Sequence, residues 1–325
     1  MDFKVSIIIP VYCVSDYIEE CLHSALDQTY GNIEYVIVDD VSPDNSISLA
    51  KALVKRKEKE QHVKFITHQK NRGLSAARNT GIRHATGDYL YFLDSDDKLL
   101  PHSIEALVEC AVKDNADVIV GNFKLIDTSE NINIPRNDKS ISQLSGNNIL
   151  LSFLQQKWVE MAWNKLTKKS VFENEECFFC EGILHEDNLW SFMLAANIKS
   201  MTICHKATYL YRIRPQSITQ QKTEKNTDDV IFIANRIIDF SNNRNYFELY
   251  KPLSDYIINI CYYAYKTMLL KSDDIDFVRR KRTAIKDLLK RIPPHSKQNS
   301  SLKSKLKVIS LSISPSILKR FFKLK

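Results

Sequence analysis

Short apolar segments alternate with amphipathic segments along the first 125 or so residues of the chain. The apolar segments are rich in β-branched residues and are typical of buried parallel strands; they span residues 4–12, 33–38, 63–67, 89–93 and 117–123. Apolar positions recur with helical spacing after Ser15 and Asp16 and within residues 46–60, 74–85 and 103–113. This alternation predicts an α/β fold with a doubly wound, mostly parallel sheet and flanking helices.

The alternation breaks beyond this region. Residues 127–146 are polar and predict a loop, residues 147–173 predict a helix followed by a turn, and Ser200–His205 predict a strand. From about Thr223 onward the pattern is helical. We therefore expect two halves of a sheet domain, a helical accessory region and a tail, over residues 1–100, 101–222, 223–301 and 302–325.

Acidic side chains gather where predicted strands end. Asp39 and Asp40 follow one strand, and Asp94-Ser95-Asp96-Asp97 follows another. Ligands of open parallel sheets lie outside the carboxyl ends of the strands, and the alternation of an extended segment sends Asp94 and Asp96 to the same side. Such carboxylates can hold Mg²⁺ or Mn²⁺ together with substrate phosphates. The alternative is that these residues only cap the helix that follows Pro101.

Glu186 and Asp187 form a third acidic cluster, at the start of a predicted amphipathic helix. A carboxylate is a common base where an attacking hydroxyl group must lose its proton. Acids in a first helical turn are also favoured by the helix dipole without any catalytic role. The residues alone leave both interpretations open.

Charge is distributed unevenly along the chain. Residues 271–325 hold 16 Lys/Arg and 4 Asp/Glu, a net charge of +12 that leaves −5 on residues 1–270, since the whole chain carries +7. Residues 10–16 contain no Gly, which counts against a Gly-x-Gly-x-x-Gly motif and so against an epimerase or oxidoreductase. Seven irregularly spaced Cys, no signal-peptide pattern and no apolar run of about 18 residues favour a cytoplasmic protein.

Two further patterns invite a functional interpretation. Cys177 and Cys180 have the spacing of a zinc or redox pair, but a second well-spaced pair is missing, so we expect two buried thiols. Trp158, Trp163 and Trp190 could stack on sugar rings, although Trp at such positions is more often part of the core.

Five segments in order resemble the inverting family 2 glycosyltransferases, which have the GT-A fold. They are spread over most of residues 4–215 and are Val5–Tyr12, Glu34–Ser46, Asn71–Gly81, Asp94–Asp97 and Leu184–Trp190. The resemblance implies a UDP-sugar donor, with Asp40 and Asp39 holding the base and ribose. It further implies that Asp94 contacts the ribose and supports the metal, that Asp96 binds Mn²⁺ or Mg²⁺, and that Arg78 lies near the sugar or diphosphate.

The same resemblance makes Asp187 the expected catalytic base and Glu186 its substrate-contacting neighbour. Arg212 and Arg214 could clamp the diphosphate, since Arg binds phosphate oxygens in bidentate fashion, or could pair with surface acids; we favour the clamp. The remaining substrate-binding positions that we expect are Pro10, Tyr12, Asn71, Gly73 and Ser95.

Two residues depart from the family pattern. Cys13 stands where the family usually has Asn, and Val41 stands where it usually has Gly. Because Val adopts a positive φ only at a cost, we expect the Asp40–Asp44 turn to differ in shape.

Together these observations predict an inverting, metal-dependent enzyme that moves one sugar from a UDP-sugar to a glycan. The chain lacks the membrane spans and the Gln-x-x-Arg-Trp motif of processive synthases, which favours single transfers in exopolysaccharide, capsule or lipopolysaccharide assembly. The alternative is a catalytically silent scaffold of the same fold that binds partners at a membrane.

The tail, residues 302–325, is basic, and Pro315 divides it into two short amphipathic pieces. In the second piece we expect Ile317, Leu318, Phe321 and Leu324 to share one helical face. Lys and Arg combined with Phe and Leu are typical of a helix that lies in a membrane interface. We therefore expect a peripheral position on the inner face of the cell membrane, an anionic lipid surface as partner, a lipid-linked acceptor, and no nucleic acid. The alternative is a solvated basic tail that is helical only against its own domain.

Overall fold

The computed structural model describes residues 2–127, 137–213, 224–244, 249–292 and 300–323. The chain divides into two compact units, Met1–Arg214 and Pro215–Lys325. The predicted boundary at residues 222/223 falls among residues outside the described ranges. Each unit is considered by itself below.

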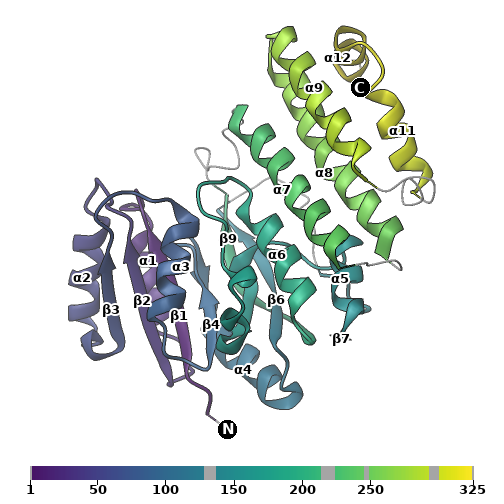
Figure 1. Cartoon of the computed structure of the whole chain (residues 1–325). Coiled ribbons are helices and arrows are strands. Elements are labelled where there is room, and N and C mark those ends of the chain that lie inside the picture. Colours follow the sequence, from purple (N-terminus) through teal and green to yellow (C-terminus); the bar gives the residue numbers. More distant parts are fainter. Residues whose placement is uncertain (1, 128–136, 214–223, 245–248, 293–299, 324–325) are drawn as a thin grey trace. The chain divides into compact units, whose positions relative to one another are not determined.

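The first unit is built on one sheet, which has nine strands among the described residues (Figure 1). The strands are β1 (Val5–Val11), β2 (Ile33–Asp39), β3 (Val63–Thr67), β4 (Tyr89–Phe92), β5 (Lys98–Leu99), β6 (Val118–Ile126), β7 (Gln143–Ser145), β8 (Lys165–Lys168) and β9 (Ser200–Arg212).

The strand order is β3-β2-β1-β4-β8-β6-β9-β5, and β7 pairs with β9. The first four strands of this order are parallel, as are β6 and β9. Strand β8 is antiparallel to both of its neighbours, and β5 and β7 are antiparallel to β9. The predicted α/β fold with flanking helices is confirmed, and the sheet is mixed: its first four strands are parallel, and the pairs that involve β5, β7 and β8 are antiparallel.

Helices cover both faces of this sheet. They are α1 (Ile18–Leu26), α2 (Ser46–Arg56), α3 (Leu74–His84), α4 (Ser103–Asp114), α5 (Asn147–Leu154) and α6 (Glu186–Asn197), with short 3₁₀ segments at Glu60–His62, Ala162–Asn164, Lys169–Glu173 and Glu175–Cys177. Apolar residues of α1, α2 and α4 share a core with Ile7 and Ile9 of β1. Helix α3 contacts the opposite face, where a Cβ atom on Gly81 would lie 2.2 Å from Cγ2 of Ile8. Glycine thus allows α3 to approach β1 closely.

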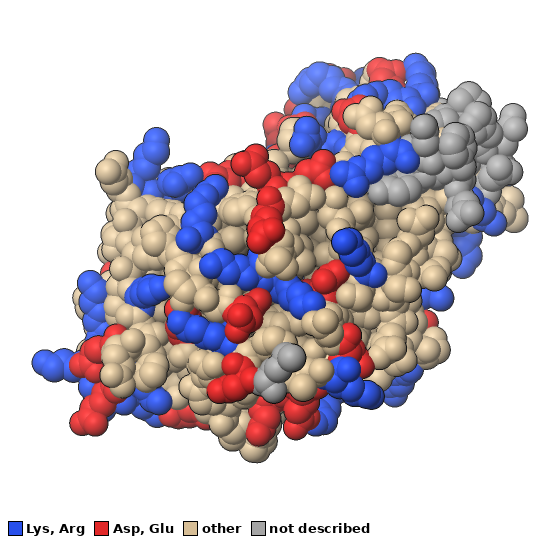
Figure 2. Space-filling view, turned by 60° about the horizontal axis from the view of Figure 1, so that its bottom comes forward, with Lys and Arg blue, Asp and Glu red and all other residues tan. Residues whose placement is uncertain are grey.

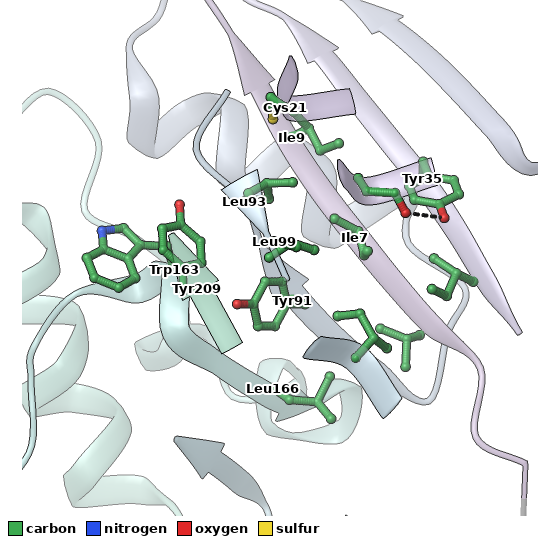
Figure 3. Close-up of a cluster of buried hydrophobic side chains, with 14 of the residues drawn as sticks. Ile7, Ile9, Cys21, Tyr35, Tyr91, Leu93, Leu99, Trp163, Leu166 and Tyr209 are labelled. Atoms are coloured by element: carbon green, nitrogen blue, oxygen red, sulfur yellow. Dashed lines mark hydrogen bonds between the residues drawn. The ribbon is translucent and has the colours of Figure 1, made fainter. Parts of the chain in front are cut away.

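Aliphatic and aromatic side chains of the sheet and of the helices on one of its faces form a buried core (Figure 3). The rings of Trp163 and Tyr209 stack with centroids 4.3 Å apart, and Tyr35 donates a hydrogen bond to the carbonyl of Ala25 at 2.8 Å. Trp158, Trp163 and Trp190 are all buried, so the core interpretation of the three tryptophans is correct.

The second half of the sheet differs from the sequence-based assignment. Strand β8 was not predicted, because Lys-Leu-Thr-Lys lacks an apolar strand pattern; Lys165 is nonetheless fully buried. Strand β9 continues to Arg212, well past His205, and β7 lies within the segment predicted as a loop. Cys177 is buried, Cys180 is partly buried, and neither forms a disulfide.

The second unit is helical, as predicted. Its described helices are α7 (Glu224–Asn243), α8 (Tyr250–Lys271), α9 (Ile275–Lys290), α11 (Leu302–Ser310) and α12 (Pro315–Lys323). Helices α7, α8 and α9 pack side by side (Figure 1). Within the described ranges, no helix combines the length and apolar character needed to cross a membrane.

The tail forms two helices, and Pro315 is the first residue of the second one. The predicted apolar face is wrong in one respect: Leu318 is buried against its own unit, whereas Ile317 and Phe321 are exposed. Leu324 lies outside the described residues. The spacing of apolar residues in the sequence could not show which of them would pack against α8 and α9.

Charged side chains of both signs are interspersed on the face of the molecule shown in Figure 2.

Candidate active site

The loops that follow β1 and β2 are fastened to each other. Asp44 accepts hydrogen bonds from the amides of Ser15 (2.9 Å) and Ser46 (3.1 Å), and the hydroxyl of Ser42 accepts one from the amide of Cys13 (2.8 Å). The donors around Asp44 hold the pKa of its carboxyl far below the ordinary range despite partial burial. The two loops therefore form one rigid rim at the carboxyl end of the sheet.

Val41 adopts a positive φ, although a Val does so only at a cost. Val41 has φ 57° and Cys13 has φ 53°, so both adopt the left-handed conformation that favours Gly or Asn. For a residue with a Cβ this conformation costs roughly 1–2 kcal/mol. The contacts of the rim, including the hydrogen bond from the Ser42 amide to Asp39 (2.9 Å), offset that cost.

The neighbouring carboxylates Asp39 and Asp40 have different environments. Asp40 is buried and accepts hydrogen bonds from the amides of Arg72 (2.8 Å) and Gly73 (2.7 Å) and from Nδ1 of His68 (2.7 Å). Asp39 is partly exposed, and within the described part of the chain nothing donates to its Oδ2. Asp40 thus fixes the loop before α3, and Asp39 is the carboxylate that remains able to bind a ligand.

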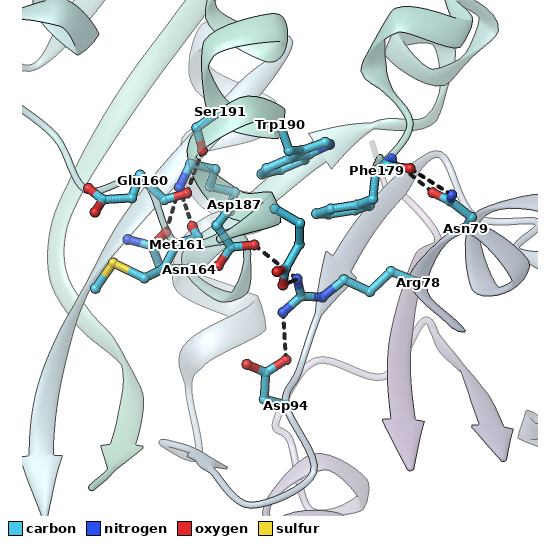
Figure 4. Close-up of polar contacts among 12 residues, drawn as sticks. Arg78, Asn79, Asp94, Glu160, Met161, Asn164, Phe179, Asp187, Trp190 and Ser191 are labelled. Atoms are coloured by element: carbon cyan, nitrogen blue, oxygen red, sulfur yellow. Dashed lines mark hydrogen bonds and ion pairs between the residues drawn. The ribbon is translucent and has the colours of Figure 1, made fainter. Parts of the chain in front are cut away.

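Arg78 joins two of the three acidic clusters, the one after β4 and the one at the start of α6. Its Nη2 donates to Oδ1 of Asp94 at 2.9 Å, and its Nη1 donates to Oε1 of Glu186 at 3.0 Å and to Oδ1 of Asp187 at 2.9 Å. Figure 4 shows the guanidinium between Asp94 on one side and Asp187 on the other. Arg78 itself is only 1% exposed, so a buried cation on α3 joins the end of β4 to the start of α6.

The residues around Arg78 hold it in place. Its guanidinium lies over the ring of Phe179, 5.1 Å from the centroid, and that ring stacks on Trp190. The next residue, Asn79, accepts a hydrogen bond from the amide of Phe179 and donates one to its carbonyl, both at 2.9 Å. Arg78 and Asn79 therefore fix the acidic centre and the segment before α6 together.

The position of these acids changes their affinity for protons. Burial, followed by the negative charge of Asp187, raises the pKa of Glu186 to about 7. Burial also raises the pKa of Asp187, although Arg78 opposes that shift, and the side chain of Asp187 is still 21% exposed. A carboxyl group with a raised pKa and a partly exposed side chain, such as that of Asp187, suits a general base.

Lys165 is a buried cation behind this centre that the sequence-based reasoning did not assign to the site. Its ammonium donates to the carbonyl oxygens of Val159 (2.8 Å) and Met161, and burial lowers the pKa of this amine to about 7. The segment that it holds includes Ala162, whose amide donates to Asp187. The sequence pattern could not reveal this contact, because nothing in it indicates that the lysine in β8 is buried.

The acids of the turn after β4 differ in burial and in their hydrogen-bond partners. Asp97 is buried and accepts hydrogen bonds from the hydroxyl of Tyr209 and the amide of Arg212, both at 2.7 Å, and burial raises its pKa well above the usual value. Asp94 and Asp96 are partly exposed. Among the described residues, no donor reaches Oδ2 of Asp94, which leaves a carboxylate oxygen for a ligand.

A protein-only metal site is not present: the described residues contain no cluster of three or more His, Cys, Asp or Glu able to hold a metal ion. A hard divalent cation that is shared with a diphosphate needs only one or two carboxylates from the protein. The donor set of Asp94 and Asp96 fits that requirement.

The remaining predicted residues lie at various distances from this centre. Arg212 donates to Glu20 and Asp127, each at 2.7 Å, so its guanidinium pairs with surface acids rather than standing open for a diphosphate. Arg214 lies outside the described residues. Tyr12 is 47% exposed at the end of β1, next to buried Pro10.

Three other predicted positions flank the carboxyl end of the sheet. Ser95 is buried in the turn after β4, and Asn71 is exposed in the loop that precedes α3. Gly73 has φ 86°, a conformation that places its amide against Asp40. Beside this loop lies a cavity of about 540 Å³ lined by Thr67, His68, Gln69, Lys70 and Arg72.

The mixed sheet flanked by helices, with acidic turns at the ends of β2 and β4, has the architecture of the GT-A fold. Residues 6–176 match the model of "Glycosyl transferase family 2", and the chain belongs to this family.

Two curated relatives and one solved structure illustrate the likeness. Glycosyltransferase GlyA of Streptococcus pneumoniae is 34% identical over 69% of this chain and 33% of its own length. WfgD of Escherichia coli, a UDP-Glc:alpha-D-GlcNAc-diphosphoundecaprenol beta-1,3-glucosyltransferase, is 34% identical over 39% of this chain and 49% of its own length. S. aureus TarS 1-349 in complex with UDP-GlcNAc superposes with a TM-score of 0.77 at 17% identity, over 99% of this chain and 92% of that one.

The chain spans a third of GlyA and slightly less than two thirds of two further bacterial relatives, of which the match covers 65% and 63%.

Proposed function

We propose that this chain is an inverting, metal-dependent glycosyltransferase that moves one sugar from a UDP-sugar to a glycan acceptor. The observation that carries the proposal is the bridge made by Arg78, which joins Asp94 at the donor side to Asp187 at the acceptor side. Transfer with inversion needs a base on the face of the sugar opposite the leaving diphosphate. One buried cation thus sets the distance between the two carboxylates that the reaction uses.

In this proposal Asp187 accepts the proton of the attacking hydroxyl. Its raised pKa gives the carboxylate the driving force to take that proton. Glu186 beside it competes for the same cation and keeps the pair partly protonated at neutral pH. Arg78 and the Ala162 amide both bind the carboxylate of Asp187 and orient the base.

Asp94 and Asp96 would hold Mn²⁺ or Mg²⁺, as is typical of the family. When bound, the ion supplies charge stabilisation for the leaving diphosphate. Asp39, with Pro10, Tyr12 and the loop around Asn71, would bind the uridine, and the fixed loop before α3 gives that site its shape. Arg212 acts, in this proposal, by holding α1 and the end of β9 together rather than by contacting the diphosphate.

The donor and acceptor classes are inferred from the relatives. UDP-GlcNAc is the ligand of TarS, and the name of WfgD specifies a UDP-sugar donor and a diphosphoundecaprenol-linked acceptor. We extend both features to this chain: a UDP-sugar donor, a lipid-linked glycan acceptor and a peripheral position on the cytoplasmic face of the membrane, in the assembly of a surface polysaccharide.

Release of UDP is the test. The full chain, with Mn²⁺ and a panel of UDP-sugars, should hydrolyse at least one donor slowly and should transfer its sugar when given a diphospholipid-linked acceptor. Addition of EDTA should stop both reactions. A catalytically silent scaffold, the alternative, would bind UDP or its partners without releasing UDP from any donor, and that outcome would overturn the proposal.

A further inference from the structure

Helices α11 and α12 both carry exposed apolar side chains. Leu302, Leu306 and Ile309 have the spacing of one face of α11, Ile317 and Phe321 have the spacing of one face of α12, and Ile313 lies in the turn between the two helices. Leu302 is 73% exposed, Ile309 60% and Ile317 63%. Below, these six residues are called the exposed stripe.

The opposite side of both helices is fixed to the unit. Leu311 and Leu318 are buried, and the guanidinium of Arg282 on α9 donates to the carbonyl of Ile313 at 2.8 Å. The ammonium of Lys319 donates to the carbonyl of Ser272 at 2.6 Å. The exposed stripe therefore cannot turn inward without breaking these contacts, so the sequence has placed large apolar side chains on a stable outer surface.

The charges on the two helices themselves have one sign, and Asp273, which pairs with Lys319 at 3.1 Å, is an acid contributed from outside them. Residues 302–325 contain seven Lys or Arg and no Asp or Glu, and Lys303, Lys305 and Arg320 are exposed next to stripe residues. A symmetric contact between two copies of this face would bring like charges together. An anionic lipid surface instead offers opposite charge and an apolar layer for the side chains.

We propose that the exposed stripe is the surface by which the chain lies in the interface of an anionic bilayer. The apolar side chains enter the acyl boundary, while Lys303, Lys305 and Arg320 stay at the level of the lipid headgroups. The inference deepens the membrane part of the proposed function. In this proposal the membrane-binding surface is already formed on the folded helical unit.

Co-sedimentation with vesicles tests the stripe. The full chain is mixed at low salt with vesicles of phosphatidylcholine containing 30% phosphatidylglycerol, and with pure phosphatidylcholine. We expect the wild type to bind the anionic vesicles. We expect the double variant I309Q/I317Q to bind them more weakly by about tenfold or more, because two of the apolar side chains that would enter the acyl boundary are lost. The matched variant S312Q/S316Q changes exposed residues of the same segment that lie off the stripe and should bind like the wild type.

Circular dichroism and UDP binding, measured on all three proteins, separate this inference from the proposed function. Both should be the same in wild type and variants, because the substitutions are on exposed side chains of the second unit. Equal vesicle binding by wild type and I309Q/I317Q overturns the inference, as does a wild type that ignores anionic vesicles while it still releases UDP. Conversion of a wild-type dimer to a monomer by I309Q/I317Q would also overturn it, because it would show a second copy as the occupant. Loss of UDP release with intact vesicle binding would contradict only the proposed catalytic function.

Discussion

Arg78 and Asp187 are 109 positions apart in the chain and are joined by a hydrogen bond of 2.9 Å between Nη1 and Oδ1. The same guanidinium binds Asp94 through its other terminal nitrogen. Because Arg78 is buried, its charge depends on these carboxylates for compensation, and the proximity of the carboxylates depends on its charge. The acids raise the pKa of Arg78 further, so it stays charged at any relevant pH.

The first prediction removes this cation. Arg78→Met leaves Asp94, Glu186 and Asp187 close together without compensation, and breaking a buried ion pair in this way typically costs about 3–5 kcal/mol. We expect a loss of this order in the free energy of unfolding, measured with urea. We also expect Arg78→Lys to recover only part of it, because an ammonium lacks the planar fork that reaches both sides.

Arg83→Met is the matched control. Arg83 is on the same helix, is exposed, and stands over the ring of Phe178 at 5.1 Å. It should cost no more than about 1 kcal/mol. Equal losses for the two Met variants would mean that Arg78 does not organise the acids.

The second prediction concerns the base. Asp187→Asn keeps the size of the side chain and can still meet the Ala162 amide, but it cannot accept a proton. We expect kcat to fall by about 10²–10⁴-fold while the affinity for UDP stays within a factor of two or so. Asp88→Asn, an exposed acid at the other end of β4, is the control and should leave kcat unchanged. Near-normal turnover in Asp187→Asn would make Asp187 an acid that only stabilises the helix start.

The first half of the sheet could be predicted from the sequence because β1, β2 and β4 are largely buried apolar runs, and β3, although only partly buried, is a short β-branched and aromatic segment. Strand β8 could not be predicted, because its two lysines break the apolar pattern. Lys165 is nevertheless buried there, and its ammonium group donates to backbone carbonyls. The acidic clusters could be located but not ranked. Asp39 and Asp40 look alike in the sequence. Only the structure of the loop before α3 shows that the carboxylate of Asp40 accepts hydrogen bonds from the amides of Arg72 and Gly73.

The conformation of Val41 shows a second limit. Local propensity argues against a positive φ, but the Asp44 hydrogen bonds that over-determine the turn come from residues on both loops. Arg212 is a third case: its partners Glu20 and Asp127 are remote in sequence, so no local pattern distinguishes a phosphate clamp from a structural ion pair.

The third prediction concerns the metal. Asp96→Ala should lower the affinity for UDP by an order of magnitude or more in Mn²⁺ and should leave the weaker affinity in EDTA unchanged, because the ion joins the carboxylate to the diphosphate. Isothermal calorimetry with and without EDTA measures both. Asp97→Asn is the contrast: Asp97 is buried on Tyr209, so its loss should affect stability and keep the metal dependence. Equal wild-type affinity for UDP in Mn²⁺ and in EDTA would remove the metal from the mechanism.

The fourth prediction concerns pH. The pKa of Glu186 is raised to about 7 by burial and by the charge of Asp187, and the two acids titrate as a pair. A base acts in its unprotonated form, and burial raises the pKa of Asp187, so we expect kcat/KM for UDP-sugar transfer to rise with pH and its midpoint to lie above the ordinary carboxyl range. The sign for stability is opposite: a carboxyl whose pKa is higher in the folded state stabilises the fold below its unfolded pKa of about 4.5 and loses that contribution as pH rises toward 7.

Glu186→Gln tests both halves of this argument. Removing the neighbouring negative charge should let Asp187 ionise at lower pH, so the midpoint of the rate profile should move down by about one pH unit. The decrease in unfolding free energy between pH 4.5 and 7 should become smaller in the same variant. Initial rates of UDP release and urea unfolding across this range give the two readouts. A wild-type midpoint near pH 4–5, or a profile that Glu186→Gln leaves in place, would show that the pair does not control the proton of the acceptor.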